Sequence, residues 1–407
     1  MTQSGQIEYR PELWNLDSDV IHLNHGSYGA CTQLGLARQS DIRQQMETNT
    51  LYFFESDLPT LLAVSRQSLA QFTGAKAENL VFVTNATTGV NTVLASFELD
   101  SRDSVLVTNH GYNACTNAVH FYARKSGARV NTVDLPFPVV DQDDVVERIL
   151  DACDDRTRLL LVDHVTSPTA LVMPLEKLVP LVQRRGIKVL VDGAHAPGML
   201  PLNLETLGAD FYTGNCHKWM CCPKGTGFLY VRPEHQRSIH PLVISHGMNR
   251  PLSDNSRFDL EFDWTGTWDP TGFIAVPSII NQLQGLCAEG WPGIMERNRA
   301  LAVEGRQIIC QTMDIEAPSP DKMLGSMATV KLPVLNEHLT IKASEDDPLK
   351  LALRSRHGIE VWLSSWKPST GRLLRISAQL YNSRNDYHRL ADALADELAM
   401  LSSSNAS

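Results

Sequence analysis

Between residues 80 and 191 the chain alternates short apolar runs with stretches of helical periodicity. The apolar runs are rich in Val and Leu, as is typical of strands that are buried on both faces; they lie at 80–84, 104–108, 158–162 and 187–191. The periodic stretches predict helices near 87–98, 113–126, 142–153 and 174–185. Strands that alternate with helices indicate an α/β domain with a mostly parallel central sheet.

The pattern changes after about residue 280. Helical stretches near 273–287 and 292–313 precede strand-like runs at 328–332, 358–362 and 373–377, and an amphipathic stretch near 384–402 predicts a terminal helix. This order of elements predicts a smaller α+β domain. We therefore expect an N-terminal segment over 1–20, a large domain over 21–280 and a small C-terminal domain over 281–407.

Polar residues follow the predicted strands directly, at 85–89, 109–112, 164–167 and 192–195. Ligands of open α/β sheets bind beyond the carboxyl ends of the strands, so these segments are expected to converge on one edge. The first of them, Asn85-Ala-Thr-Thr-Gly89, places hydroxyls and backbone N–H groups at a helix start, where an anion can bind. No G-x-G-x-x-G or Walker sequence follows any strand, which gives nucleotide binding little support.

Composition and charge exclude several classes of partner. The 407 residues are 43% hydrophobic and 20% charged, as in an ordinary globular protein. A net charge of −10 argues against nucleic-acid or anionic membrane partners, which require clustered Lys and Arg. The sequence shows neither a secretory signal pattern nor an apolar run long enough to span a membrane.

The eight cysteines are scattered along the chain, which fits a reducing compartment, and we expect the protein to be cytoplasmic. Cys216, Cys221 and Cys222 are close in sequence but lack the paired spacing of a zinc site. Buried thiols are the simpler interpretation.

A carboxylate and a lysine supply the first candidate chemistry. Asp192 ends an apolar strand, and Lys218 follows in the segment 210–219, which is expected to be a second strand ending in that lysine. Pyridoxal phosphate (PLP) requires such a pair, because a carboxylate keeps its pyridine nitrogen protonated and an amine forms the Schiff base. Lys218, between His217 and Trp219, is expected to have its pKa lowered by desolvation, which favours imine formation.

Two other interpretations of these residues stay open at this point. A metal-dependent hydrolase could use Asp163, His164, Asp192, His195 and His217 as ligands, but it would leave Lys218 unexplained. A binding protein without catalytic activity could also use this fold, although the intact Lys–Asp pair argues against it.

Three segments add a resemblance to a known family: Leu23-Asn-His-Gly-Ser-Tyr-Gly29, Asp163-His-Val-Thr-Ser-Pro-Thr169 and Gly214-Asn-Cys-His-Lys-Trp219. With them, the chain from about residue 20 to 400 resembles the class V aminotransferase family of fold-type I PLP enzymes. Within this family it is similar to the isopenicillin N epimerase-like branch. The resemblance implies a large domain with a mostly parallel central sheet, a smaller C-terminal α+β domain and PLP as cofactor.

The resemblance also implies a role for individual residues. Lys218 would form the Schiff base, Asp192 would pair with the pyridine nitrogen, Tyr112 would stack on the ring and His195 would lie near its phenolic oxygen; these are the four expected catalytic residues. Asn215 stands where the desulfurase pattern has a serine. The expected cofactor-binding residues are Ala86, Thr87, Thr88, Tyr112, Ser167, Asp192, His195, Asn215, His217, Lys218, Gly266 and Thr267.

Further matches concern the substrate and the partner subunit. Thr265-Gly266-Thr267 matches a segment that in relatives reaches the phosphate of the neighbouring subunit, which implies a homodimer with shared active sites. Arg375 matches the arginine that clamps the substrate α-carboxylate, a task suited to a bidentate guanidinium. Asn24 and Ser27 are expected to line the substrate pocket.

One departure narrows the chemistry. Desulfurases that form a persulfide carry a cysteine on the loop before the carboxylate-binding arginine, but residues 361–371 contain none. The nearest cysteine upstream is Cys310, in a predicted helix. Sulfur transfer through a protein persulfide is therefore not expected, and direct chemistry at Cα or Cβ of an amino acid remains.

The expected reaction runs through an external aldimine and a quinonoid, with the Lys218 amine removing the Cα proton. Reprotonation on the opposite face gives an epimerase, loss of a Cβ substituent gives a lyase, and protonation of the cofactor gives an aminotransferase. Epimerisation needs a second acid or base, for which Tyr112, His195 and Tyr28 are candidates, whereas β-elimination needs only Lys218 and a leaving group. We favour an epimerase-like enzyme, with a C–S lyase acting on a cysteine derivative as the alternative.

Overall fold

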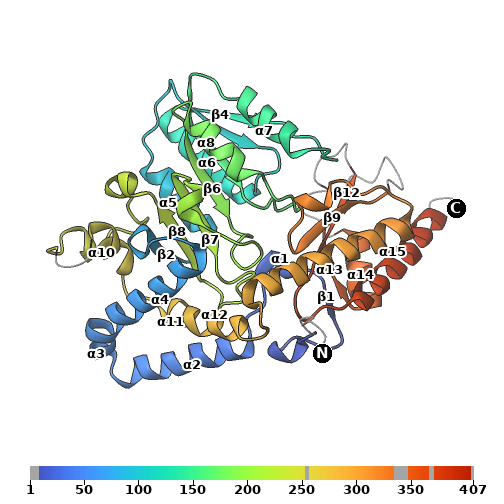
Figure 1. Cartoon of the computed structure of the whole chain (residues 1–407), viewed down its shortest axis with the longest axis horizontal. Helices are drawn as coiled ribbons and strands as arrows, with labels where there is room; N and C mark the ends of the chain where they lie inside the picture. Colours follow the sequence, from blue (N-terminus) through green and yellow to red (C-terminus); the bar gives the residue numbers. More distant parts are fainter. Residues whose placement is uncertain (1–8, 253–255, 334–346, 366–370, 405–407) are drawn as a thin grey trace.

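A computed structural model describes residues 9–252, 256–333, 347–365 and 371–404. Its larger part is built on a seven-stranded sheet (Figure 1) with the order β2-β8-β7-β6-β5-β3-β4. The strands are β2 (Leu80–Val83), β3 (Ser104–Thr108), β4 (Arg129–Val133), β5 (Thr157–Asp163), β6 (Lys188–Gly193), β7 (Phe211–Asn215) and β8 (Gly227–Val231). β8 runs in the direction opposite to the other six strands, so the sheet is mostly parallel, as predicted.

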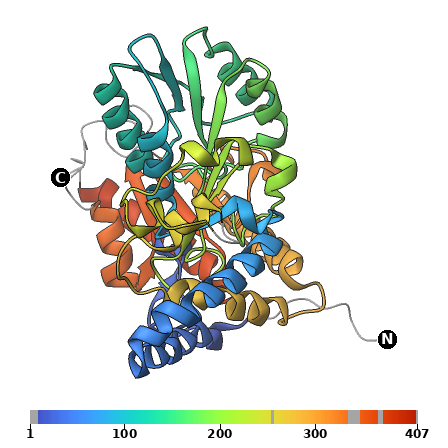
Figure 2. The same ribbon diagram turned by 90° about the vertical axis from the view of Figure 1, so that its left-hand side faces the viewer.

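Helices cover both faces of this sheet. Alternate residues of a strand point to opposite faces: Phe82 belongs to one buried cluster, while Val81 and Val83 belong to another. In Figure 2 the strands lie between α6 on one side and α7 and α8 on the other. The helices of this part are α1 (His25–Tyr28), α2 (Gln33–Thr48), α3 (Thr50–Tyr52), α4 (Leu58–Thr73), α5 (Ala86–Ser96), α6 (Asn113–Ser126), α7 (Gln142–Asp151), α8 (Leu175–Gln183), α9 (Leu204–Leu207), α10 (Arg257–Asp263), α11 (Thr271–Ile274) and α12 (Val276–Gln284).

The smaller part has its own core and its own sheet. Strands β11 (Trp362–Ser365), β12 (Arg372–Ser377) and β9 (Met327–Lys331) form an antiparallel sheet in that order. Helices α13 (Gly290–Met313), α14 (Pro348–His357) and α15 (Arg384–Ser404) pack with it around a separate apolar cluster. The short strand β1 (Ile21–His22) pairs with β10 (Ile359–Glu360), which ties the N-terminal region to this part. The domain limits at residues 20 and 280 stay a prediction.

Several expected elements need correction. β4 was not predicted, because its sequence Arg-Val-Asn-Thr-Val is half polar and the strand lies at the exposed edge of the sheet. β8 was missed although it is fully buried, because it returns antiparallel beside β7 with no helix between them. The strand expected to end in Lys218 ends at Asn215, so the lysine lies in the following turn. Among the described helices, none has the length and apolar character needed to cross a membrane.

Candidate active site

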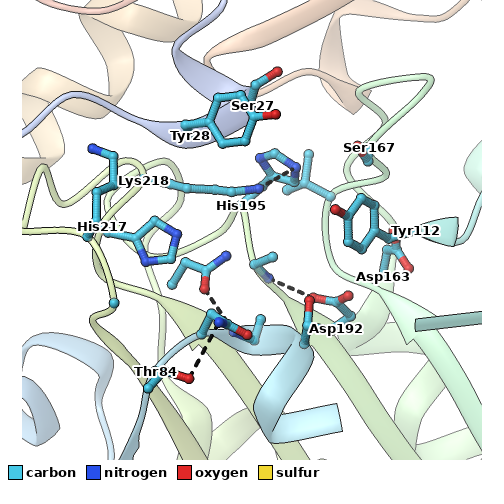
Figure 3. Close-up of a pocket in the computed structure, with 18 residues that line it drawn as sticks. Ser27, Tyr28, Thr84, Tyr112, Asp163, Ser167, Asp192, His195, His217 and Lys218 are labelled. Carbon is cyan, nitrogen blue, oxygen red and sulfur yellow. Dashed lines mark hydrogen bonds between the residues drawn. The ribbon is translucent and has the colours of Figure 1, made fainter. Parts of the chain in front are cut away.

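A cavity of about 270 Å³ opens between the sheet and α1, which contains Ser27 and Tyr28 (Figure 3). It draws on segments that follow β2, β3, β5, β6 and β7, so the polar residues after these strands converge as predicted. Its lining consists of Ser27, Tyr28, Thr84, Asn85, Ala86, Thr87, Tyr112, Asp163, Val165, Ser167, Asp192, Ala194, His195, Asn215, His217, Lys218, Lys224 and Gly225.

Asp192 is a buried carboxylate near the end of β6 (Figure 3). Its Oδ1 accepts the backbone N–H of Ala194 at 3.0 Å, and its Oδ2 accepts the thiol of Cys115 at 3.0 Å. Within the described residues no cationic side chain forms an ion pair with it. A buried carboxylate is costly without a positive partner, so a protonated group of a ligand would be favoured beside it.

Lys218 reaches the cavity from the turn between β7 and β8. Its Nζ lies 3.3 Å from Nε2 of His195, and its backbone carbonyl is held by Nε2 of His25 at 3.0 Å. Burial, with a further contribution from the positive charge of Arg375, lowers the pKa of Lys218 to about 8. An appreciable fraction of the amine is therefore neutral, and hence nucleophilic, near neutral pH.

His195 is neutral in this setting. Burial and the charge of Lys218 hold the pKa of His195 well below its usual value. Its Nδ1 is buried and has no hydrogen-bond partner among the described residues. A buried polar atom without a partner is uncommon and points to a ligand group.

The N-terminus of α5 forms the anion-binding end of the cavity. The N–H of Ala86 donates to Oδ1 of Asn215 at 2.8 Å, and the N–H of Thr88 donates to Oδ1 of the N-cap residue Asn85 at 2.8 Å. Thr87 lines the cavity, and its N–H and hydroxyl make no hydrogen bond within the described part of the chain. Both are therefore available to an anion, and the helix dipole favours negative charge there. Thr88 itself does not line the cavity; its hydroxyl bonds to Thr84 and Asn85.

Two further side chains line the cavity, a neutral histidine and a lysine. His217 bonds through Nδ1 to the carbonyl of Thr226 at 3.0 Å, and burial lowers its pKa to about 4. Lys224 lines the cavity together with Gly225. Lys224 was not predicted; it lies in the turn before β8, so recognising that strand would have pointed to it.

Arg375, on β12, is a buried cation near the cavity; neither Arg375 nor Asn24, which was expected to line the substrate pocket, belongs to the lining of the cavity. Its Nη1 donates to the carbonyl of Ser167 at 2.6 Å, and its Nη2 donates to Oγ of Ser27 at 3.1 Å and to Oδ1 of Asn24 at 3.4 Å. The guanidinium is buried, stacks at 5.0 Å on Trp362, and has no carboxylate partner within the described part of the chain. Burial lowers its pKa to about 10, so it stays charged at neutral pH.

Tyr112 and Tyr28 are the aromatic side chains of the cavity (Figure 3). Tyr112 is the N-cap of α6 and is partly exposed, and burial of the remainder raises its pKa, so the phenol carries its proton at neutral pH. Tyr28 is largely exposed. Gly266 and Thr267 do not line the cavity of their own chain, and Thr267 is exposed.

The residues present fit PLP. The buried carboxylate of Asp192 suits the pyridine nitrogen of this cofactor, and the N-terminus of α5 suits its phosphate. Lys218, with its lowered pKa, suits the aldehyde. When bound, PLP withdraws electrons from the substrate Cα and so stabilises a carbanion there. The described residues contain no group of three or more His, Cys, Asp or Glu side chains arranged for a metal ion.

Fold and site define a PLP-dependent enzyme of fold-type I. The family described as Aminotransferase class-V matches residues 44–390, and the chain belongs to this family.

Curated relatives with two different activities cover most of the chain. It is 33% identical to the probable chloroplastic L-cysteine desulfhydrase of Arabidopsis thaliana, over 96% of this chain and 85% of that protein. It is also 33% identical to the isopenicillin N epimerase of Amycolatopsis lactamdurans, over 95% of this chain and 97% of that protein. Among solved structures, the cysteine desulfurase CsdA of Escherichia coli matches with a TM-score of 0.76 at 19% identity, covering 96% and 98% of the two chains, which is a similarity of fold.

Proposed function

We propose that this protein is a C–S lyase that breaks the Cβ–S bond of cysteine or of a small cysteine derivative. The observation that carries the proposal is the acid–base character of the cavity. Lys218 is the described cavity side chain best suited to remove a proton, since its amine has a pKa lowered to about 8. One base is sufficient for β-elimination, whereas epimerisation requires two groups on opposite sides of Cα.

The other titratable groups near Lys218 support this assignment. His195 lies beside Lys218, at 3.3 Å, so it is not separated from it across a substrate. Asp163 is buried beside Asp192, and burial raises its pKa well above the usual value, so it holds its proton. Tyr112 also keeps its proton, which suits an acid that delivers a proton to the leaving sulfur.

Arg375 would hold the substrate α-carboxylate. The buried guanidinium has no carboxylate partner in the described part of the chain. A substrate carboxylate would replace the contacts of its Nη2 to Ser27 and Asn24 and would receive charge-assisted hydrogen bonds instead. If Arg375 holds the α-carboxylate while the Lys218 amine lies near Cα, the Cα proton would point toward that amine.

The size of the cavity favours a small substrate. Ligand pockets usually measure about 300–1,000 Å³, and this cavity of about 270 Å³ must also contain the cofactor. A substrate of the size of cysteine would need less of this space than a larger amino acid derivative. The similarity to a probable L-cysteine desulfhydrase is compatible with such a substrate.

The overall reaction would convert cysteine and water into pyruvate, ammonia and hydrogen sulfide. Lys218 takes the Cα proton, the Cβ–S bond breaks with its electron pair leaving on sulfur, and Tyr112 protonates that sulfur. Water then hydrolyses the released enamine to pyruvate and ammonia.

Epimerisation is the second candidate, favoured by Tyr112 and by the similarity to an isopenicillin N epimerase. A protonated phenol in the cavity can deliver a proton to Cα if it faces the side opposite Lys218.

An incubation in D₂O separates the two reactions. The enzyme loaded with PLP is incubated separately with L-cysteine, S-methylcysteine and L-alanine. The measured quantities are pyruvate, sulfide or thiol, and the configuration and deuterium content at Cα of the amino acid. Equal amounts of pyruvate and thiol from the cysteine substrates support the lyase. A D-amino acid carrying deuterium at Cα, formed without pyruvate, would overturn it.

Tyr112→Phe adds a second readout. Loss of epimerisation together with retained elimination would show that the phenol of Tyr112 delivers a proton to Cα. Lys218→Ala serves as the control without a base.

We further propose a homodimer in the cytoplasm. The segment 265–267, in which Thr267 is exposed, resembles one that serves the neighbouring subunit. Exposed apolar side chains on α2 and α3, Leu34, Leu36, Leu51 and Tyr52, support a partner surface. The eight free cysteines support a reducing compartment.

A further inference from the structure

Cys115 makes a contact that the proposed reaction does not use. It is the third residue of α6, it is buried at 1% exposure, and it lies outside the lining of the cavity. Its side chain sits in the apolar cluster on the α5–α6 face of the sheet, yet its Sγ lies 3.0 Å from Oδ2 of Asp192.

The direction of this hydrogen bond follows from the electrostatics. Burial and the neighbouring negative charge of Asp192 both raise the pKa of Cys115, so the thiol keeps its proton and donates. The N–H of Ala194 donates to the other oxygen, Oδ1. Each carboxylate oxygen therefore receives one donor from the protein and keeps acceptor capacity for a ligand.

We propose that Cys115 is a positioning residue for the cofactor. Its S–H fixes the rotation of the Asp192 carboxylate from behind the cavity wall and so sets how tightly the apo-protein takes up PLP. A thiol is a weak donor, so it orients the carboxylate without satisfying its charge, which stays available to the pyridine nitrogen.

The contrasting view is that Cys115 only fills space, since a buried free cysteine commonly behaves as a small apolar residue. The two roles separate when a donor is removed and then restored at the same position. Cys115→Ala removes the donor, and Cys115→Ser restores one at similar size. This comparison concerns cofactor uptake and does not depend on which reaction the enzyme catalyses.

The first experiment measures the dissociation constant of PLP for the apo-proteins by absorbance titration. Removal of one hydrogen bond to a charged group is expected to weaken binding about tenfold in Cys115→Ala, and Cys115→Ser is expected to bind within about twofold of the wild-type protein, because its donor is restored. The matched control is Cys216→Ala, which removes another buried thiol. Among the described residues this thiol contacts no carboxylate, so the variant should bind PLP as the wild type does. Wild-type affinity in Cys115→Ala, or equal weakening in the Ala and Ser variants, would overturn the proposal.

The second experiment observes the bond without cofactor. The infrared S–H stretch of Cys115, assigned from the difference between the wild-type and Cys115→Ala apo-proteins, is expected below the frequency of the Cys216 thiol. In Asp192→Ala it should move up to that of Cys216. A Cys115 band that does not respond to Asp192→Ala, in a variant whose circular dichroism shows it folded, would contradict the assigned contact.

Discussion

The pKa of Lys218 determines when the amine can capture the cofactor aldehyde. Because burial and Arg375 lower this pKa to about 8, the neutral amine gains population as pH rises toward 8 and is dominant above it. The rate at which apo-protein captures PLP should therefore rise about tenfold per pH unit below 8 and then level off. Stopped-flow absorbance between pH 6 and about 10 tests this, after correction by the same reaction with a free lysine derivative, which also removes the titration of PLP.

The contribution of Arg375 to the lowered pKa of Lys218 can be tested separately. Arg375→Gln removes the second contribution, so the plateau should shift to higher pH, whereas Lys177→Ala, which removes an exposed lysine paired with Asp143, should leave it unchanged. A wild-type rate that still climbs steeply above pH 9 would mean that the amine is not desolvated as the structure indicates.

Arg375 should control substrate affinity more than it controls cofactor binding. Lys cannot reproduce the fork toward a carboxylate and toward Ser167 and Ser27, so Arg375→Lys should raise KM for cysteine about 10- to 100-fold, as expected for loss of a charge-assisted hydrogen bond. Arg372→Lys is the matched control, since it lies on the same strand and pairs with Asp347. An Arg375→Lys variant with unchanged KM, measured by steady-state kinetics, would exclude the proposed carboxylate site.

Sequence alone predicted the residues whose chemistry is distinctive and left out those whose role depends on contact. Lys218 and Asp192 stood out because a lysine and a carboxylate near strand ends are few and specific. Cys115 could not be found, because its role depends on a 3.0 Å contact between a helix and a strand 77 residues apart. Trp362 is similar: it matters only because β11 pairs Trp362 directly with Arg375.

At the scale of elements, the pairing of β5 with β6 places Asp163 directly beside Asp192. Burial and the Asp192 charge raise the pKa of Asp163 well above 3.8, its value in the unfolded chain. Above pH 3.8 the folded protein then binds more protons than the unfolded chain, so the free energy of unfolding falls as pH rises until the folded-state pKa is passed. A pKa that is higher by one in the folded protein than in the unfolded chain lowers this free energy by about 1.4 kcal/mol.

Asp163→Asn should therefore stabilise the apo-protein at neutral pH. The amide cannot ionise, so the cost disappears, and the gain should be present at pH 7 and vanish below pH 3.8, the pKa in the unfolded chain. Chemical denaturation at several pH values measures it. Asp210→Asn provides the opposite sign: although burial alone would raise the pKa of Asp210, hydrogen bonds from His235 and Gln183 lower it, so that variant should lose stability at neutral pH.

The same sheet shows which elements could be predicted. β3, β5 and β6 were found because strands in the middle of a parallel sheet are apolar on both faces and are followed by helices. β4 lacks the apolar run because an edge strand faces solvent, and β8 lacks the following helix. The position of Lys218 in the turn between β7 and β8 depends on that missed hairpin, so the strand-end assignment was three residues off.

At the scale of the whole molecule, the cavity is lined by several segments of one chain, but segment 265–267 of that chain is not among them. Ser27 and Ser167, from the larger part, both accept hydrogen bonds from Arg375 of the smaller part, so the two parts of one chain meet at this arginine. Thr267 lies exposed and away from this cavity. A second subunit would give that segment a function at the phosphate end.

Complementation between two inactive variants tests the shared site. Lys218→Ala lacks the base, and Thr267→Asp places a negative charge where the partner's phosphate is expected. In a mixed dimer, the subunit with intact Lys218 faces the intact Thr267 of the other chain, so one of its two sites is complete. If subunits exchange at random, half of the dimers are mixed, and activity should return to about a quarter of the wild-type value.

The control mixes Lys218→Ala with Asp192→Ala, two changes that each fall in the cavity of their own chain. Every mixed dimer of this pair has a defective residue in each of its two sites, so activity should stay at the background of the separate variants. Recovery in the first mixture and none in the second is expected only if Thr267 acts across the subunit boundary. If light scattering shows dimers and the first mixture still does not recover, Thr267 lies outside the partner's site. The Thr267→Asp change would then inactivate the cavity of its own chain, which is the chain that carries the intact Lys218.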